Sequence, residues 1–237
     1  MPDFTDKDFP ANPYPGARPE GSFVHLDQSG WWLKPNRDHP SGWGMRNSDL
    51  GAALEEMGAP SIQDRLPVLA YGSNANPSKI TWLRNELGLV GPVVVIRARC
   101  KDIAAVWSAG KRARDGQRPA VLAALPGSVE DHTIWLATPE QRQVLDECEG
   151  RGQRYRLSWL RADIQLENGA QPARVLAYTA RPEALGKNVE EHSNRSPLLV
   201  GGELVPCSSV TQEAAVELSG SPAEGDGLDV VEVTGEP

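Results

Sequence analysis

Two short stretches of this chain carry residue types and spacings that are suited to chemistry. The first is Tyr71-Gly72-Ser73-Asn74, which follows the apolar run Val68–Ala70. A buried strand that ends at a glycine turn and leads into a helix leaves backbone N–H groups free at one place. There they can hold a carboxylate or a polarised carbonyl oxygen. An ordinary strand-to-helix connection has the same spacing, so the motif alone leaves both interpretations open.

The second stretch is the end of a helix that the sequence marks at both ends. Thr138, Pro139 and Gln141 form a capping box with a proline in the first turn, and Gly150 terminates the helix. Glu149 lies in the last turn, at the rim of the apolar face. Partial desolvation and the negative end of the helix dipole both raise the pKa of a carboxylate at this position. Such a carboxylate suits a general base.

Two further carboxylates lie close to Glu149 in the sequence. Asp146 and Glu147 belong to the same helix, and the helical wheel hardly separates Glu147 from Glu149 as a candidate. Acidic side chains near a helix end are mostly solvated. The residue types alone therefore leave open whether Glu149 is catalytic or a surface carboxylate.

The composition excludes several classes of function. The 237 residues carry a formal net charge of −8, which argues against non-specific binding to nucleic acid or to an anionic membrane. The basic cluster between Arg97 and Arg118 is interpreted as a solvated face. Three scattered cysteines give no disulfide or zinc spacing, and His132, which has no histidine at paired ligand spacing, is expected on the surface, so no metal site is predicted. With neither a signal peptide nor a membrane span visible, we expect a cytoplasmic protein.

The elements that must position the two stretches are predicted from apolar periodicity and capping residues. A helix capped by Asn74 or Asn76 follows the first stretch, with Ile80, Leu83 and Leu87 on one face. Strands are predicted at 68–71, 92–96, 104–107, 120–125, 132–137, 155–160 and 173–178, with a short element at 197–202. Strands and helices mix without regular alternation, which favours an α+β domain around a small, mostly antiparallel sheet or barrel.

Both ends of the chain are expected to lie outside this domain. Residues 1–60 form an extension rich in Trp, Pro and Gly, with a disordered or extended start and a helix over 49–57 capped by Ser48. Its tryptophans form a strap packed over the main domain, or else line a ligand groove. The domain itself is assigned to residues 61–212. Residues 213–237 are acidic and are expected to be disordered.

Taken together, the two stretches resemble the γ-glutamylcyclotransferase-like (AIG2-like) superfamily. In that family a YGSN loop follows the first strand, and an LDxxEG segment with a tyrosine a few residues later carries the essential glutamate. Here the matching residues are Tyr71–Asn74, Leu145–Gly150 and Tyr155, and the resemblance covers about residues 66–205. This chain departs from the family pattern at His132–Trp135, where only the tryptophan of the family segment is kept. It also lacks the family's later Pro-Ser segment near residues 191–197.

The resemblance implies a small mixed β-barrel with flanking helices, and a cavity that holds a γ-glutamyl group. Tyr71, Gly72, Ser73 and Asn74 would cradle that group, Tyr155 and Tyr178 would line the wall, and Glu149 would be the general acid and base. The reaction releases 5-oxoproline and an amine from a small-molecule γ-glutamyl substrate, without a cofactor. The alternatives are a non-catalytic small-molecule-binding member of the same fold and a tailoring enzyme that removes a γ-glutamyl protecting group. The leaving amine and the oligomeric state stay unassigned.

Overall fold

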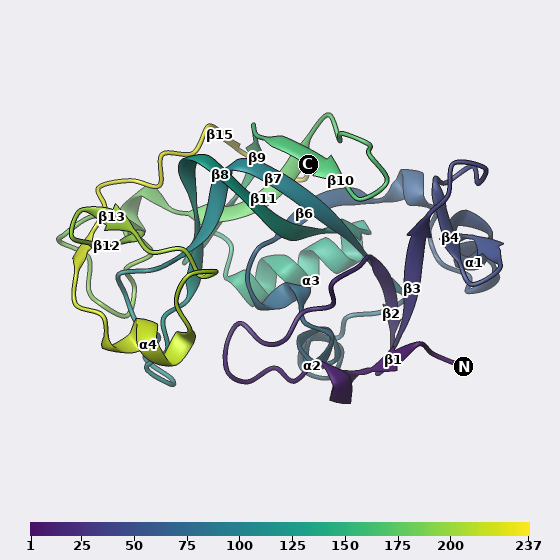
Figure 1. The fold of residues 1–237 in the computed structure, drawn as a ribbon, viewed down its shortest axis with the longest axis horizontal. Helices are drawn as coiled ribbons and strands as arrows, with labels where there is room; N and C mark the ends of the chain where they lie inside the picture. Colours follow the sequence, from purple (N-terminus) through teal and green to yellow (C-terminus); the bar gives the residue numbers. More distant parts are fainter.

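Two long antiparallel strands form the axis of the molecule in the computed structural model, which describes residues 1–237. They are β7 (Val93–Trp107) and β8 (Ala120–Ala137), paired from Val94–Leu136 to Trp107–Ala120 (Figure 1). The sequence predicts four shorter strands here. The structure joins them, because the pairing of β7 with β8 resumes after a register shift between Lys101 and Ile103, where Asp102 at φ 60° and residues 125–128 have no partner.

The remaining strands extend this pair on both sides into one twelve-stranded sheet. Its order is β15-β9-β11-β6-β8-β7-β2-β3-β4-β5, with β1 added to β3 and β10 added to β7. Only β11 and β6 are parallel neighbours. The bounds are β1 (Phe4–Thr5), β2 (Phe23–Leu26), β3 (Ser29–Pro35), β4 (Trp43–Met45), β5 (Ser48–Asp49), β6 (Leu66–Ala70), β9 (Tyr155–Leu160), β10 (Asp163–Leu166), β11 (Val175–Ala180) and β15 (Val230–Glu232).

The α+β class agrees with the sequence-based expectation, but the closed barrel does not. The two ends of the strand order, β15 and β5, do not pair with each other. Beyond β7 the sheet continues into β2, which pairs with residues 93–95, and into β10, which pairs with residues 98–101, but β10 does not pair with β9. A second, three-stranded sheet of β12 (Leu198–Val200), β13 (Glu203–Leu204) and β14 (Ser221–Pro222) lies at the left in Figure 1.

Four α-helices and four short 3-10 turns complete the fold. They are α1 (Leu50–Glu56), α2 (Pro77–Leu87), α3 (Pro139–Glu149), α4 (Gln212–Glu217), η1 (Asp6–Asp8), η2 (Ile62–Asp64), η3 (Ser73–Ala75) and η4 (Pro182–Ala184). The capping box of α3 and its end at Gly150 form as predicted. In α1, Asp49 rather than Ser48 is the N-cap, since the Asp49 carboxylate accepts from Ala52 N–H.

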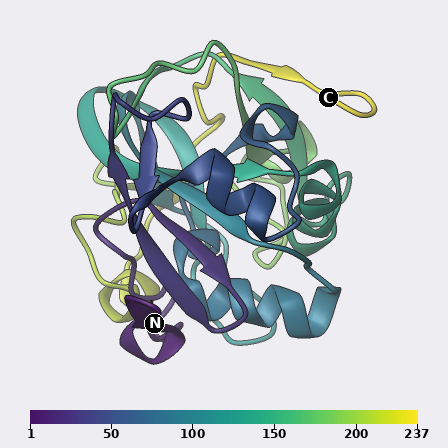
Figure 2. The same cartoon turned by 90° about the vertical axis from the view of Figure 1, so that its right-hand side faces the viewer.

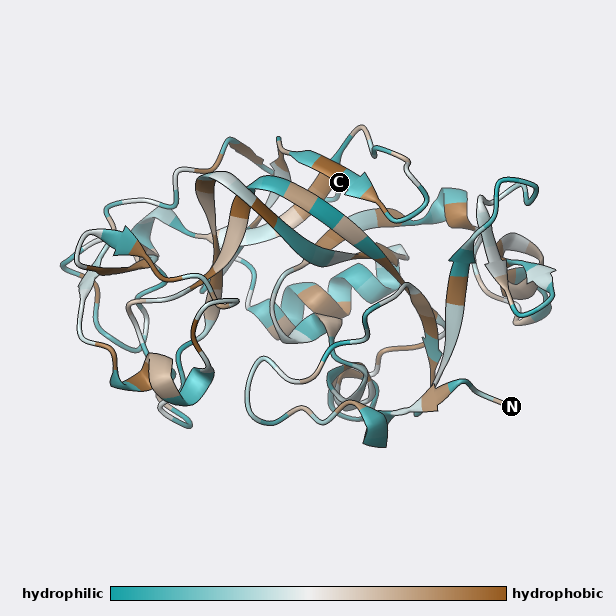
Figure 3. Cartoon of the chain, viewed as in Figure 1, coloured by the Kyte–Doolittle hydropathy of each residue, from teal (hydrophilic) through white to brown (hydrophobic).

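The apolar core is divided between the two faces of the sheet. One cluster includes Leu50 and Leu54 of α1, and the other includes Leu83 of α2, Leu145 of α3 and Trp135 of β8. Apolar residues recur along β7 and β8, whereas α3 carries both apolar and polar residues (Figure 3). The helix that ends at Glu149 is thus fixed against the strand pair through its apolar side. His132, expected on the surface, is only 3% exposed.

The first twenty residues are ordered by contacts with distant parts of the chain, contrary to the disordered or extended start expected from composition. The fully buried Asn76, not Asn74, caps α2 by accepting from Lys79 N–H at 2.8 Å. The amide nitrogen of Asn76 donates to the carbonyls of Phe9, Pro10 and Ala17 at 3.0, 3.1 and 2.7 Å. One side chain therefore joins the N-terminal segment to the start of α2. The purple N-terminal strands cover one end of the molecule in Figure 2.

We expect Asn76→Ala to destabilise the fold by roughly 1–3 kcal/mol, because it removes a helix cap and leaves three carbonyl groups of the N-terminal segment without their donor. Chemical denaturation followed by circular dichroism measures this change. Asn85→Ala, an exposed position on the same helix, is the matched control and should cost a few tenths of that amount. A free energy of unfolding in Asn76→Ala equal to that of the control would contradict this role.

The last 25 residues also differ from the expected disordered tail. β15 pairs antiparallel with β9, Val233 is 9% exposed, and Glu236 forms an ion pair with the buried Arg142. The reason is that β9 would otherwise be an unpaired sheet edge, and the Val-rich segment 230–233 supplies the missing strand. The domain limits at 60/61 and 212/213 stay predictions, although strands from all three segments share one sheet. None of the helices has the length and apolar composition needed to cross a membrane.

Candidate active site

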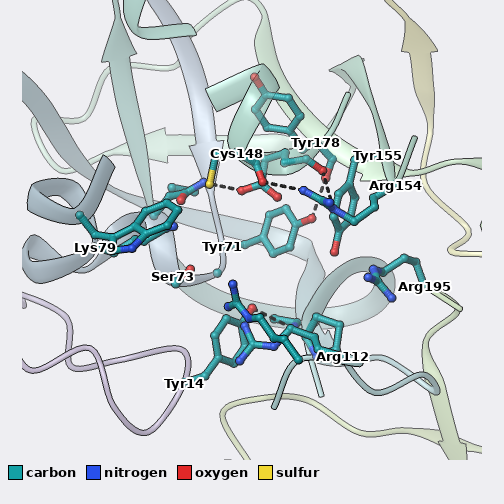
Figure 4. Close-up of a pocket in the computed structure, with 18 of the residues that line it drawn as sticks. Tyr14, Tyr71, Ser73, Lys79, Arg112, Cys148, Arg154, Tyr155, Tyr178 and Arg195 are labelled. Atoms are coloured by element: carbon teal, nitrogen blue, oxygen red, sulfur yellow. Dashed lines mark hydrogen bonds between the residues drawn. The ribbon is translucent and has the colours of Figure 1, made fainter. Parts of the chain in front are cut away.

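A cavity of about 380 Å³ lies between the end of β6, the first turn of α2 and the C-terminal end of α3 (Figure 4). This volume falls within the ~300–1,000 Å³ that small-molecule sites commonly occupy. All seven residues singled out from the sequence line it, namely Tyr71, Gly72, Ser73, Asn74, Glu149, Tyr155 and Tyr178. The structure therefore brings the two predicted stretches to one place, although about 75 residues separate them.

Glu149 and the glycine turn are in direct contact. The amide nitrogen of Asn74 donates to a carboxylate oxygen of Glu149 at 2.7 Å. The backbone of Asn74 is fixed in turn by Trp135, whose indole N–H donates to the Asn74 carbonyl at 2.9 Å. The core residue Trp135 thus positions the residue that holds Glu149.

The structure separates the three neighbouring carboxylates. Asp146 points away from the cavity and accepts hydrogen bonds from Tyr178 at 2.7 Å, from Arg151 at 3.1 Å and from Arg142. Glu147 is exposed to solvent. Among the residues that line the cavity, Glu149 is the only carboxylate. Geometry thus supplies the distinction that the helical wheel leaves open.

Burial raises the pKa of Glu149 above its ordinary value. The hydrogen bond from Asn74 and the positive charges of Lys79, Arg154 and Arg195 act in the opposite direction without cancelling the effect of burial. The direction agrees with the sequence-based expectation. A carboxylate with a raised pKa holds a proton more readily, so it can both accept one and return it during a reaction.

All four tyrosines of the chain line this cavity. Tyr71 donates its hydroxyl hydrogen to the Tyr178 carbonyl at 2.6 Å, and Tyr178 donates to Asp146. Burial raises the pKa of each tyrosine, to about 12 for Tyr155. The tyrosine side chains therefore stay protonated at neutral pH and present neutral walls around Glu149.

Several residues that line the cavity are not predicted from the sequence. Lys79, Arg112, Arg114, Arg154 and Arg195 surround the cavity with positive charge. Arg112 and Arg114 belong to the basic cluster that the sequence suggests is a solvated face, and no local pattern separates them from its other members. They reach the cavity because the loop between β7 and β8 folds over it. Arg97 and Lys101 of the same cluster form exposed ion pairs instead.

The tryptophans of the N-terminal extension do not line this cavity. Trp31 and Trp43 pack against the core cluster next to α1, and Trp32 packs against the opposite cluster. This agrees with a packed strap and not with a ligand groove. The extension contributes a different residue to the cavity, Tyr14, which sequence reasoning missed because its position depends on contacts with residues 70–120.

Comparison with protein-family models and with curated proteins finds no match for this chain. Among solved structures, a protein described as a gamma-glutamyl cyclotransferase is similar at 19% identity and a TM-score of 0.40, over 49% of this chain and 66% of that one. An uncharacterized protein from Homo sapiens is similar at 17% identity and a TM-score of 0.41, over 50% of this chain and 68% of that one. This chain thus spans about two thirds of the length of each.

Proposed function

We propose that this protein is a γ-glutamylcyclotransferase-type enzyme that releases 5-oxoproline and a free amine from a small γ-glutamyl compound. One observation carries the proposal. Glu149, the only carboxylate in a cavity large enough for a γ-glutamyl group, is hydrogen-bonded at 2.7 Å to Asn74 of the glycine turn. This contact supports a role for Glu149 as a proton acceptor beside a turn that would hold the substrate.

The proposed reaction uses a nucleophile that the substrate already carries. The α-ammonium group gives a proton to Glu149, and the free amine then attacks the γ-carbonyl carbon to form a C–N bond within the same molecule. The bond from this carbon to the leaving nitrogen breaks, and Glu149 returns the proton to that nitrogen. The ring nitrogen gives up its second hydrogen as a proton to the released amine, which leaves as an ammonium ion. A cavity that folds the substrate into a ring-like conformation contributes up to about 7–11 kcal/mol.

The glycine turn has the features needed to stabilise the developing oxyanion. In η3, Ala75 and Asn76 donate to the carbonyls of Gly72 and Ser73, whereas the N–H groups that open the turn have no acceptor within it. Such donors stabilise an oxyanion when they point at the site where charge develops. We propose that Gly72, Ser73 and Asn74 bind the glutamyl group, while Tyr71, Tyr155 and Tyr178 form the cavity wall.

Removing the Asn74 side chain should shift the pH dependence of this reaction. The hydrogen bond from Asn74 lowers the pKa of Glu149, so Asn74→Ala should raise that pKa further. Because Glu149 must be ionised to act as a base, the acidic limb of kcat/KM should move to higher pH. The control Asn85→Ala, exposed on α2, should leave the limb in place. An unshifted acidic limb in Asn74→Ala would show that Asn74 does not tune the base.

The proposed function is tested with a panel of γ-glutamyl amino acids and γ-glutamyl amines. We expect 5-oxoproline and free amine to appear in equal amounts for at least one member of the panel. A binding-only protein would saturate with a ligand from the panel and form no product. That outcome would reject the proposed enzyme and support a non-catalytic member of the fold.

A further inference from the structure

A loop of the N-terminal extension, residues 9–18, contributes Tyr14 to the lining of the cavity. This segment lies outside the region, 66–205, on which the resemblance rests. The three hydrogen bonds from Asn76 hold its two ends, and Ser78 donates to the Phe9 carbonyl at 2.8 Å. Arg18 donates to the Tyr71 carbonyl at 2.8 Å, next to the glycine turn. The loop is therefore a fixed part of the site.

The side chain of Tyr14, at the centre of this loop, is held in one orientation. Its hydroxyl oxygen accepts a hydrogen bond from Ala120 N–H at 3.0 Å. Its ring lies 6.3 Å from the ring of Trp107, and the guanidinium group of Arg112 stacks over it at 4.5 Å. Figure 4 shows Tyr14 on the side of the cavity opposite to Cys148, the neighbour of Glu149.

The hydroxyl group of Tyr14 reaches the glycine turn. A Cβ atom placed on Gly72 would lie only 3.2 Å from the Tyr14 oxygen. Although this oxygen accepts the hydrogen bond from Ala120, no acceptor of the protein takes its own hydrogen. The cavity thus contains an oriented hydroxyl donor beside Gly72. Burial raises the pKa of Tyr14, so this donor keeps its proton at neutral and moderately alkaline pH.

We propose that Tyr14 donates its hydroxyl hydrogen to the substrate's γ-carbonyl oxygen, on which negative charge develops during the attack. This inference rests on the proposed function, because it assigns a role within the same reaction. Glu149 would handle the proton on the nitrogen atoms, and Tyr14 would stabilise the oxygen across the cavity. A hydroxyl donor that is already oriented by Ala120 loses little freedom when the oxyanion forms, which is the condition for effective stabilisation.

The first test is Tyr14→Phe, which removes the hydroxyl group and keeps the ring between Trp107 and Arg112. Loss of one such donor commonly lowers kcat by about 10²–10³-fold. We expect a loss near the lower end of that range, with KM changed only a few-fold. The control is Thr81→Val on α2, which removes a hydroxyl group that donates to the Asp27 carbonyl outside the cavity. This control should leave kcat within a few-fold of wild type.

Because Tyr14→Phe also removes the acceptor for Ala120 N–H, a second variant separates the two roles. A fluorinated tyrosine introduced only at position 14 keeps the oxygen but makes its hydrogen more acidic, and should raise kcat a few-fold at unchanged melting temperature. Suppose that wild type releases 5-oxoproline and that Tyr14→Phe and the fluorinated variant both have the kcat of wild type. The role of Tyr14 is then rejected and the proposed function stands. A wild type that forms no 5-oxoproline rejects both.

Discussion

Glu149→Gln should reduce the rate of 5-oxoproline release by about 10²–10⁴-fold, the range contributed by a positioned general acid–base group. Gln has nearly the same shape, so the cavity and the contact with Asn74 keep their dimensions, but it cannot accept the proton of the α-ammonium group. The loss should appear in kcat, and substrate binding should change little. Initial rates of product formation across the substrate panel measure the effect.

The control for this variant is Glu147→Gln, two residues earlier in α3 and exposed to solvent. It changes the net charge by the same amount, so it should retain activity near that of wild type. Equal losses in both variants, or turnover by Glu149→Gln near the wild-type rate, would reject Glu149 as the base.

The stability of Glu149→Gln gives a second, independent signature. Because burial raises the pKa of Glu149 in the folded state above its ordinary value of 4.5, the folded protein binds this proton more tightly than the unfolded chain. The free energy of unfolding of the wild type therefore falls as pH rises from about 4.5 through the folded-state pKa of Glu149. Above that pKa, Glu149 is ionised in the folded protein, and the whole destabilisation caused by its buried charge is present. At neutral pH, Glu149→Gln should unfold at the same or a higher temperature than wild type.

Trp135→Ala should cause the largest loss of stability, about 3–5 kcal/mol, as expected for deleting a fully buried aromatic side chain. This is a large share of the ~5–15 kcal/mol that stabilises a typical domain. The same change removes the indole donor to the Asn74 carbonyl, so activity should fall even at temperatures where the variant stays folded. Urea denaturation and initial rates measure the two effects.

Trp82→Ala is the control for this core substitution, since Trp82 is 41% exposed at the rim of the cavity. It should lower the free energy of unfolding by less than about 1 kcal/mol. A comparable loss in both variants would mean that burial of Trp135 is not the source of its contribution. Trp135→Phe, which keeps most of the apolar volume but not the N–H group, separates packing from the hydrogen bond to Asn74.

The parts of the fold that depend on local signals could be predicted from the sequence. Thr138 and Gln141 define the start of α3 by contacts within four residues, and Gly150 ends it in the left-handed conformation, φ 65°. The Tyr71–Asn74 turn is similarly local. Because these signals fix where Glu149 and the turn lie in their elements, the sequence predicts the main residues of the candidate site.

The remaining parts depend on contacts between distant residues. Asn76 holds carbonyls about 60 residues away, and Tyr14 is fixed by Ala120 across 106 positions, so neither sequence neighbourhood predicts the cavity wall. The final strand forms only because β9 offers it a free edge. Composition alone favours disorder in both terminal segments, and long-range pairing overrides it.

Product identity tests the central claim most directly. The wild-type protein would be incubated with the γ-glutamyl panel in ¹⁸O-labelled water, and the products analysed by mass spectrometry. Attack by the substrate's own amine predicts 5-oxoproline without ¹⁸O, in an amount equal to the released amine. Glutamate carrying ¹⁸O would mean that water is the nucleophile, and that result, or the absence of any product, would contradict the cyclotransferase account.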